Sequence, residues 1–402
     1  MTTQTIGWGT TYSQVSILAE PIAADTGLAK SQIFFGVTLL YACAAVTSAR
    51  AGRLADRFGG LILLITGSVV FSLALWLMST AEGLVGYLIP WAIIGGFFHV
   101  GLVTSAYAAL SQVLGRDAVG AVTTLTIATG LCSSIFWPFS EWLLATHSWR
   151  GVLQIYAALT LCFVLPVHVL LWWFLGKRRL DDAENAPSPA PSRVPAHKET
   201  RVQALMIAVA SLGGLVTVGF GVVAIEMFTA LGTPRAAAVW AAALIGPAYL
   251  VSRGAAFWLQ RWTKPTQLTV ITYAALPISI FPLFPFAFTG TALPGWVAAM
   301  VAFGFGLPGG MVGLVKSILP LYLFGSNGYG ARLGLQARGT EAASAIAPSG
   351  FTVLLGLNAT GLLGSVLAVC AAAHFCAVRL GHLVIGTEQS DAEAKNNGAP
   401  HQ

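Results

Sequence analysis

The sequence predicts an all-α membrane protein with about twelve transmembrane helices arranged as two six-helix halves. Of its 402 residues, 56% are hydrophobic and only 9% are charged, whereas soluble domains carry roughly 25% charged residues. The mean hydropathy is +0.76. Apolar stretches of about 18 residues or more follow one another along the chain, and each is long enough to cross a hydrocarbon core as a helix. This composition excludes a water-soluble globule.

Six apolar stretches make up a predicted N-terminal half, residues 1–175, each bounded by glycine, a charge or a short polar turn. They lie at roughly 6–24, 31–51, 61–80, 84–110, 120–145 and 150–175. The first has room for only about 19 residues and barely crosses a bilayer.

A polar stretch, residues 176–202, is predicted to be a cytoplasmic linker, because its charged and Pro/Ser/Ala-rich composition cannot bury enough apolar surface to fold alone. The C-terminal half, residues 203–380, and a polar cytoplasmic tail, residues 381–402, follow it. The spans of this half lie at roughly 203–230, 236–260, 267–289, 294–320, 332–356 and 358–380. A shift of about 210 residues aligns three glycine pairs, which favours two related halves: Gly96 with Gly306, Gly115 with Gly325, and Gly120 with Gly330.

The positions of lysine and arginine predict the orientation, since positive residues of short loops stay on the cytoplasmic side. With both termini inside, only Lys30, Arg150 and Arg235 face outside. The cytoplasmic set is Arg53, Arg57, Arg116, Lys177, Arg178, Arg179, Arg193, Lys198, Arg201, Arg261, Lys264 and Arg332. The net charge of +6 therefore indicates membrane orientation, not nucleic-acid binding, because the basic residues are spread over loops.

One charged turn, Gly52 to Gly60, interrupts the apolar sequence after the second predicted span. Its residues Gly52, Leu54, Asp56, Arg57 and Gly59 resemble the loop motif of the major facilitator superfamily, found between transmembrane helices 2 and 3. The family pattern normally continues with basic residues, and here Gly60 and Leu61 stand instead. The resemblance implies a transporter of the major facilitator fold that works by alternating access.

The same resemblance implies a role for this turn as a cytoplasmic gate, formed by Gly52, Arg53, Asp56, Arg57 and Gly59. Asp56 would contact the start of helix 11, where the positive end of a helix favours an anion. Arg53 and Arg57 would tie the inward gate.

Ionisable residues within spans are candidate functional groups, because each costs about 2.5 to 3.5 kcal/mol to insert. Arg253 in the eighth span is the first of these, since its planar guanidinium matches a carboxylate with two parallel hydrogen bonds. Its position resembles that of the helix 8 arginine in the monocarboxylate and oxalate/formate branches, which holds the substrate carboxylate. Tyr249 stands where animal monocarboxylate carriers have an acidic residue. A structural arginine bonded to backbone carbonyls is the alternative.

The resemblance to the oxalate-type carriers, which place a basic residue on helix 11 facing the one on helix 8, implies that Arg338 in the eleventh span is a second anchor. A local ion pair between Arg338 and Glu341 is the preferred alternative. Glu226, His99 and Glu341 are predicted proton-coupling groups, because desolvation brings carboxyl and imidazole groups within reach of physiological pH. The alternative for Glu226 is a solvated side chain without a coupling role, and the alternative for His99 is a histidine that only packs in the core.

Aromatic side chains of the first and fifth spans, chiefly Tyr12 and Trp137, are predicted to shape the substrate site, with a role in the core or in the interfacial aromatic belt as the alternative. The five cysteines all lie inside apolar runs without CxxC spacing, so we expect packing roles and neither a metal nor a cofactor. There is no GxxxxGK[ST] sequence, which favours transport driven by an ion gradient.

These observations predict a monomeric secondary transporter of the bacterial cytoplasmic membrane, a symporter or antiporter and not an enzyme. Its expected substrate is a small organic anion such as a monocarboxylate, with a proton as the coupling ion. Efflux of drug-like or toxic compounds is the alternative within transport, and a membrane receptor or sensor built on a transporter fold is the alternative of another class.

Overall fold

The prediction of an all-helical membrane protein is confirmed by the computed structural model. Ten helical segments of the described part of the chain are long and apolar enough to cross a membrane by length and composition. The first and eleventh predicted spans are also helical but are not among the ten. The structure describes residues 1–115, 118–130, 132–181, 193–259, 261–326 and 328–397.

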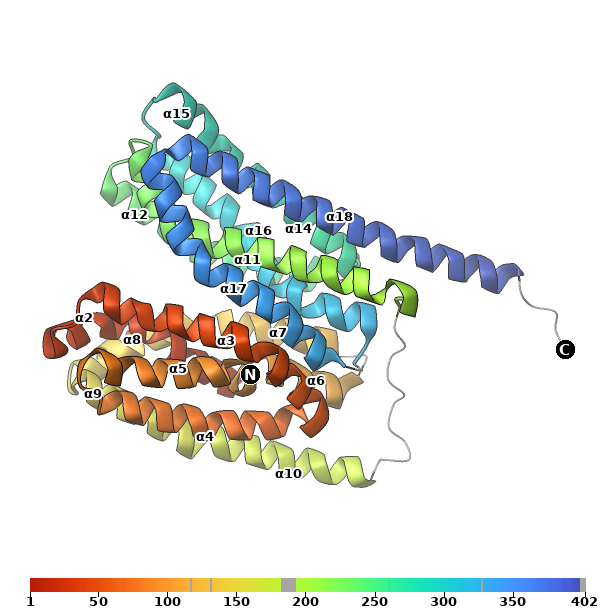
Figure 1. The fold of residues 1–402 in the computed structure, drawn as a ribbon, viewed down its shortest axis with the longest axis horizontal. Helices are drawn as coiled ribbons and strands as arrows, with labels where there is room; N and C mark the ends of the chain where they lie inside the picture. Colours follow the sequence, from red (N-terminus) through yellow and green to blue (C-terminus); the bar gives the residue numbers. More distant parts are fainter. Residues whose placement is uncertain (116–117, 131, 182–192, 260, 327, 398–402) are drawn as a thin grey trace. The chain divides into compact units, whose positions relative to one another are not determined.

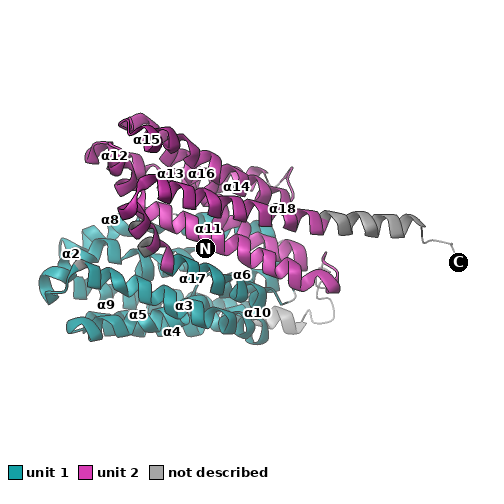
Figure 2. Ribbon diagram, turned by 45° about the horizontal axis from the view of Figure 1, so that its top comes forward, with its two compact units in different colours: residues 1–189, 326–345 teal, residues 190–325, 346–402 magenta. Residues whose placement is uncertain are grey.

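The chain forms two compact units, which Figure 2 shows in different colours. Unit 1 comprises Met1–Pro189 together with Ser326–Ala345, and unit 2 comprises Ala190–Gly325 together with Ile346–Gln402. The long helix α17 (Tyr329–Leu357) therefore begins within unit 1 and ends within unit 2.

Unit 1 is a bundle in which α5 packs extensively against both α3 and α4 (Figure 1). Large side chains of α5, such as Tyr87 and Trp91, are fully buried in its core. The helices of the unit that precede α17 are α1 (Thr2–Trp8), the π-helical η1 (Gly9–Ser13), α2 (Val15–Thr26), α3 (Lys30–Phe58), α4 (Gly60–Ser79), α5 (Gly83–Gly101), α6 (Val103–Leu114), α7 (Ala118–Gly130), α8 (Cys132–Leu144), α9 (Trp149–Leu159), the π-helical η3 (Thr160–Val164) and α10 (Leu165–Asp181).

Close helix packing in unit 1 depends on glycines at two contacts. A Cβ atom on Gly95 of α5 would overlap the backbone of Leu40 on α3, and one on Gly67 of α4 would overlap the backbone of Gly101. Small residues let helix backbones approach in a membrane, where the lipid gives no hydrophobic drive for helices to associate. These glycines therefore fix α5 between its two neighbours.

Unit 2 is built around α16, which packs against α13 and α14, while α11 packs against α18. Its core includes the fully buried rings of Phe220, Phe305 and Tyr273. Its helices, besides the second part of α17, are the 3₁₀-helical η4 (Ala196–Lys198), α11 (Glu199–Ala230), α12 (Arg235–Ala243), α13 (Ile245–Leu259), α14 (Pro265–Ile280), the 3₁₀-helical η5 (Phe281–Leu283), α15 (Phe284–Thr289), α16 (Gly295–Phe324) and α18 (Ala359–Asn397).

The predicted linker, 176–202, is helical at both ends, because α10 continues to Asp181 and α11 begins at Glu199. Just before α11, the backbone N–H of Arg193 donates to the Leu323 carbonyl oxygen at 2.8 Å. The Arg193 guanidinium also lies over the Tyr322 ring, 4.3 Å from its centroid. The chain is thus anchored to the end of α16 where it enters unit 2. Residues 182–192 and Arg116 lie outside the described residues.

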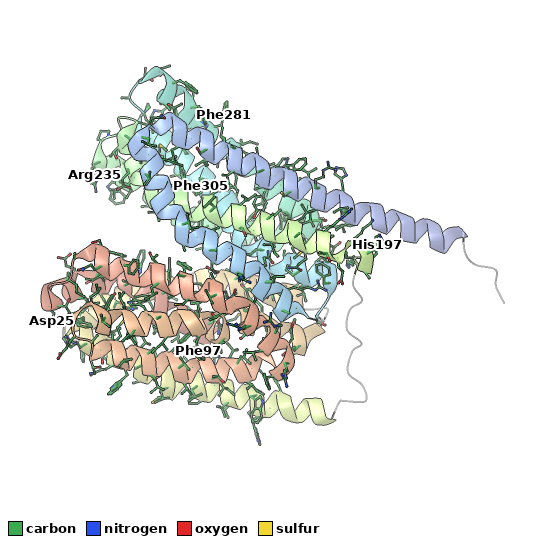
Figure 3. The ribbon with its side chains drawn as sticks, in the orientation of Figure 1. Asp25, Phe97, His197, Arg235, Phe281 and Phe305 are labelled. Carbon is green, nitrogen blue, oxygen red and sulfur yellow. The ribbon has the colours of Figure 1, made fainter. Side chains whose placement is uncertain are left out.

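A network of polar contacts joins three helix ends of unit 1 near Asp25, which Figure 3 labels. The Asp25 carboxylate accepts hydrogen bonds from Trp149 Nε1 and Arg150 Nη2, each at 3.0 Å. Arg150 Nη1 donates to the carbonyl oxygens of Ser79 at 3.0 Å and Ala81 at 2.9 Å, at and just beyond the end of α4. A cation at the C-terminus of a helix satisfies its free carbonyls and complements its dipole.

We predict that Arg150→Ala destabilises the protein by about 1–3 kcal/mol, because two carbonyls lose a charged donor. Asp25→Asn is expected to cost less than about 1 kcal/mol, since the ion pair is partly exposed and screened by solvent. Thermal unfolding of the detergent-solubilised variants measures both. An equal loss for Asp25→Asn and Arg150→Ala would mean that the ion pair, and not the carbonyl contacts, holds this end together.

Candidate functional site

The predicted gate turn contacts the beginning of α17. The two carboxylate oxygens of Asp56 accept hydrogen bonds from the backbone N–H groups of Gly330 at 2.8 Å and Ala331 at 2.7 Å. These N–H groups belong to the first turn of the helix, where they have no partner within the helix and the dipole favours an anion. A Cβ atom on Gly52 would overlap the Gly330 carbonyl oxygen, so the motif glycine allows this close approach.

The other residues of the turn end α3 and connect it to α4. Gly59 has a φ of +91°, a conformation that glycine adopts without strain. Gln112 of α6 donates from Nε2 to the Ala55 carbonyl oxygen at 2.9 Å and accepts at Oε1 from the Gly60 N–H at 3.0 Å. Gln112 therefore holds the turn in place, a role that the sequence analysis missed. Arg53 and Arg57 are exposed.

Four aromatic rings of unit 1 form a closed cycle of edge-to-face contacts. Trp8 lies 5.8 Å from Tyr12 and 5.2 Å from Phe98, and Tyr41 lies 5.9 Å from Tyr12 and 6.3 Å from Phe98, as distances between ring centroids. Such pairs are each worth about 0.5–1.5 kcal/mol beyond burial. Tyr12 lies in the π-helical turn η1, and turns of this type are frequent at functional sites.

Two predicted proton-coupling residues, His99 and Glu341, lie together next to this aromatic cycle. His99 is 4% exposed and Glu341 is 7% exposed, and their Nε2 and Oε1 atoms are 3.9 Å apart. The rings of Tyr12 and Tyr41 are in edge-to-face contact, and both tyrosines interact electrostatically with the Glu341 carboxyl group. On its other side, His99 Nδ1 lies 2.8 Å from Thr104 Oγ1. We call these five residues, Tyr12, Tyr41, His99, Thr104 and Glu341, the polar cluster.

The local ion pair expected between Arg338 and Glu341 is not present. Glu341 is buried and faces His99, whereas the Arg338 side chain is exposed on the same helix. The Glu341 carboxyl group is therefore directed toward His99 on α5 and not toward Arg338 on its own helix.

Trp137 donates from Nε1 to the Ser13 carbonyl oxygen at 3.1 Å, which satisfies a backbone group of the π-helical turn.

Arg253 lies within α13 of unit 2 and is partly buried. A Cβ atom on Gly313 of α16 would lie 3.7 Å from Arg253 Nη2, so the guanidinium packs over this glycine. Tyr249, one turn earlier on α13, interacts electrostatically with Arg253, and its ring lies against Gly309. Glycines of α16 thus leave room for the two polar side chains of α13.

Glu226 lies in the last turns of α11, and its side chain is exposed. Within the described residues, no group of three or more His, Cys, Asp or Glu side chains is arranged to hold a metal ion.

Tyr41 and Thr104 complete the polar cluster but were not predicted. Thr104 could have been found, because the polar pair Thr104-Ser105 follows His99 inside a predicted span. Tyr41 could not, since a single tyrosine in an apolar helix is usually a core or interface residue.

Comparisons with known proteins agree with this architecture. A sequence profile of the Major Facilitator Superfamily matches residues 2–348. The chain therefore belongs to this superfamily, whose members are membrane transporters and not enzymes.

Two solved structures of XylE share the fold. One is the proton:xylose symporter bound to 6-bromo-6-deoxy-D-glucose, with a TM-score of 0.65, 16% identity, and coverage of 94% of this chain and 92% of that one. The other is a double tryptophan mutant, with a TM-score of 0.71, 16% identity, and coverage of 95% and 94%.

Among curated proteins, monocarboxylate transporter 13 of Bos taurus is 30% identical over 111 residues. The aligned stretch covers 28% of this chain and 26% of the relative, so the match spans about a quarter of the curated protein's length.

We predict that Asp56→Asn destabilises the protein by about 1–2 kcal/mol, because the amide nitrogen of Asn cannot accept one of the two N–H groups of α17 and the bond that remains loses its charge. Arg53→Ala is the control, as an exposed residue of the same turn, and should change stability by less than about 0.5 kcal/mol. Thermal unfolding compares the two. Equal stability of both variants would show that Asp56 adds nothing to the position of α17.

Proposed function

We propose that this member of the superfamily transports a small organic anion, a monocarboxylate, together with or in exchange for protons. The observation that carries the substrate class is the partly buried Arg253 within a membrane-spanning segment. The partial similarity to a monocarboxylate transporter supports the same class. The distribution of positive residues supports a bacterial cytoplasmic membrane location with both termini inside.

The chemistry of Arg253 favours a carboxylate over a neutral or cationic substrate. A guanidinium stays charged at any physiological pH, so its burial in a span is compensated best by an anion that binds with two parallel hydrogen bonds. Gly313 adds no side chain beside Nη2. Arg338, which is exposed on α17, is the proposed second anchor.

We predict that Arg253→Lys and Arg253→Ala raise the KM for a carboxylate about tenfold or more, because a charged hydrogen bond is worth about 1.5–3 kcal/mol. Uptake of labelled acetate, lactate, pyruvate and benzoate into proteoliposomes is the measurement. Arg261→Ala, which removes an exposed arginine just beyond α13, is the matched control. The same assay on Arg338→Ala tests the second anchor.

Lactamide provides a control on the ligand side, since it keeps the size of lactate but lacks the carboxylate. Normal transport by both Arg253 variants would contradict the anchor. Saturable transport of an apolar dye, at a rate that added carboxylates do not change, would favour efflux of drug-like compounds instead.

The pair formed by His99 and Glu341 is the proposed proton-coupling site. A carboxyl group and an imidazole that are buried together exchange a proton at little cost, because the charged states stabilise each other. Glu226 was an equal candidate from sequence, but its side chain is exposed in unit 2, whereas His99 and Glu341 are buried together. We therefore rank Glu341 and His99 before Glu226.

We predict that Glu341→Gln and His99→Gln lose uptake driven by a pH gradient but retain exchange of internal for external substrate, since exchange requires no net proton movement. Glu226→Gln is the matched comparison and should keep both activities. Proteoliposomes with and without an imposed pH gradient separate the two modes. A gradient requirement that persists unchanged in Glu341→Gln and His99→Gln would remove both residues from coupling.

The contact of Asp56 with α17 is proposed to act as the cytoplasmic gate, together with Gly52, Gly59 and the exposed Arg53 and Arg57. In that role it governs the rate of the conformational change and not the binding of substrate. The Asp56→Asn variant should then transport more slowly with nearly normal substrate affinity, and a large loss of affinity would instead assign the motif to the binding site.

A further inference from the structure

The fourth span of the protein, residues 83–114, is not one continuous helix. It consists of α5 and α6, which are separated at Leu102, where φ is −122° and ψ is −137°. A break of this kind frees backbone groups from the helical hydrogen-bond pattern, and in a membrane they must find partners inside the protein. Breaks in spans of transporters often mark places where the chain moves or binds.

Side chains replace the hydrogen bonds that the break removes. Ser105 Oγ donates to the His99 carbonyl oxygen at 3.0 Å, and Gln4 Nε2 of α1 donates to the Gly101 carbonyl oxygen at 3.4 Å. The contact between His99 Nδ1 and Thr104 Oγ1, at 2.8 Å, crosses the break and joins the last turn of α5 to the first turn of α6. Of these three contacts, only the last includes a group that can change its protonation state.

The direction of the hydrogen bond between His99 and Thr104 depends on Glu341. When Glu341 is ionised, it favours a hydrogen on the facing Nε2 atom of a neutral His99, so Nδ1 accepts a hydrogen bond from the Thr104 hydroxyl group. When Glu341 is protonated, Nε2 can accept its proton or its hydrogen bond, and Nδ1 then carries a hydrogen and donates to Thr104. The Thr104 hydroxyl group must then find another acceptor at the break.

Among the described residues, two further titratable groups lie near this pair, Tyr12 on η1 and Tyr41 on α3, and both interact electrostatically with Glu341. Tyr12 also interacts with the Cys132 thiol of α8. Loss or gain of one proton at Glu341 thus changes the electrostatic environment of both tyrosines and the hydrogen bond across the break between α5 and α6.

We propose that His99 relays the protonation state of Glu341 to the break at Leu102, which makes the fourth span a proton-controlled hinge. Thr104 is the positioning residue of this relay, because it contacts His99 and lies on the far side of the break. The inference rests on the proposed coupling of transport to protons, and it names the element of unit 1 that responds to the proton.

The test measures backbone amide exchange of residues 99–106 in the substrate-free protein in lipid nanodiscs, at acidic and at neutral pH, corrected for the chemical exchange rate. In the wild type, protection of this segment should differ between the two pH values by about fivefold or more, the lower end of coupling between linked sites. Glu341→Gln and Thr104→Val should abolish this ratio. Thr104→Ser, which keeps the hydroxyl group, should restore it.

Ser105→Ala is the matched control, since it removes a hydrogen bond at the break that contains no titratable partner. It should lower protection equally at both pH values and keep their ratio. A wild-type ratio near one, or a ratio that persists in Glu341→Gln, would overturn the relay.

Uptake of labelled carboxylates by the same variants separates this inference from the proposed function. Absent uptake by the wild type, with the exchange ratio intact, removes the proposed substrate and supports the relay. Normal uptake driven by a pH gradient in Thr104→Val removes the relay and leaves the proposed function in place.

Discussion

The structure depends above all on one constraint of the lipid bilayer, which is that every backbone N–H and C=O group must be hydrogen-bonded within the protein. Helices meet it without help, and they make up the regular structure of the described residues. Where unit 1 departs from the α-helix, other side chains supply the bonds: Trp137 at the π-helical turn, and Gln4 and Ser105 at the break of the fourth span. The irregular segments are therefore also the places where distant helices are tied together.

The same constraint explains why the polar cluster combines several spans. A buried carboxyl group needs polar groups around it, and Glu341 faces His99 of α5 and interacts electrostatically with tyrosines of η1 and α3. Asp56 meets the same requirement near the end of α3, because the N–H groups in the first turn of α17 have no partner within the helix and need an acceptor. An acidic side chain makes each of these contacts. Asp56 accepts hydrogen bonds from the backbone of α17, and Glu341, which belongs to α17, faces His99.

Much of the fold could be predicted from sequence, because long apolar runs have one stable form in a membrane. The contact of Asp56 was predictable from its motif. The pairing of His99 with Glu341 was not, since residues so far apart in sequence meet only through packing, and the nearby Arg338 offered Glu341 a simpler partner. The break at Leu102 was also not predictable from the sequence, because leucine is a good helix former and no proline lies near it.

The break in the fourth span also bears on how the protein is assembled. One of the side chains that replace the lost hydrogen bonds, Gln4, belongs to another span, so the fourth span is less able to break while it is alone in lipid. Residues 83–114 should therefore enter the bilayer as one straight helix and bend at Leu102 only after α1 has brought Gln4 into contact with Gly101. The shape of this span is thus a product of tertiary assembly and not of its insertion.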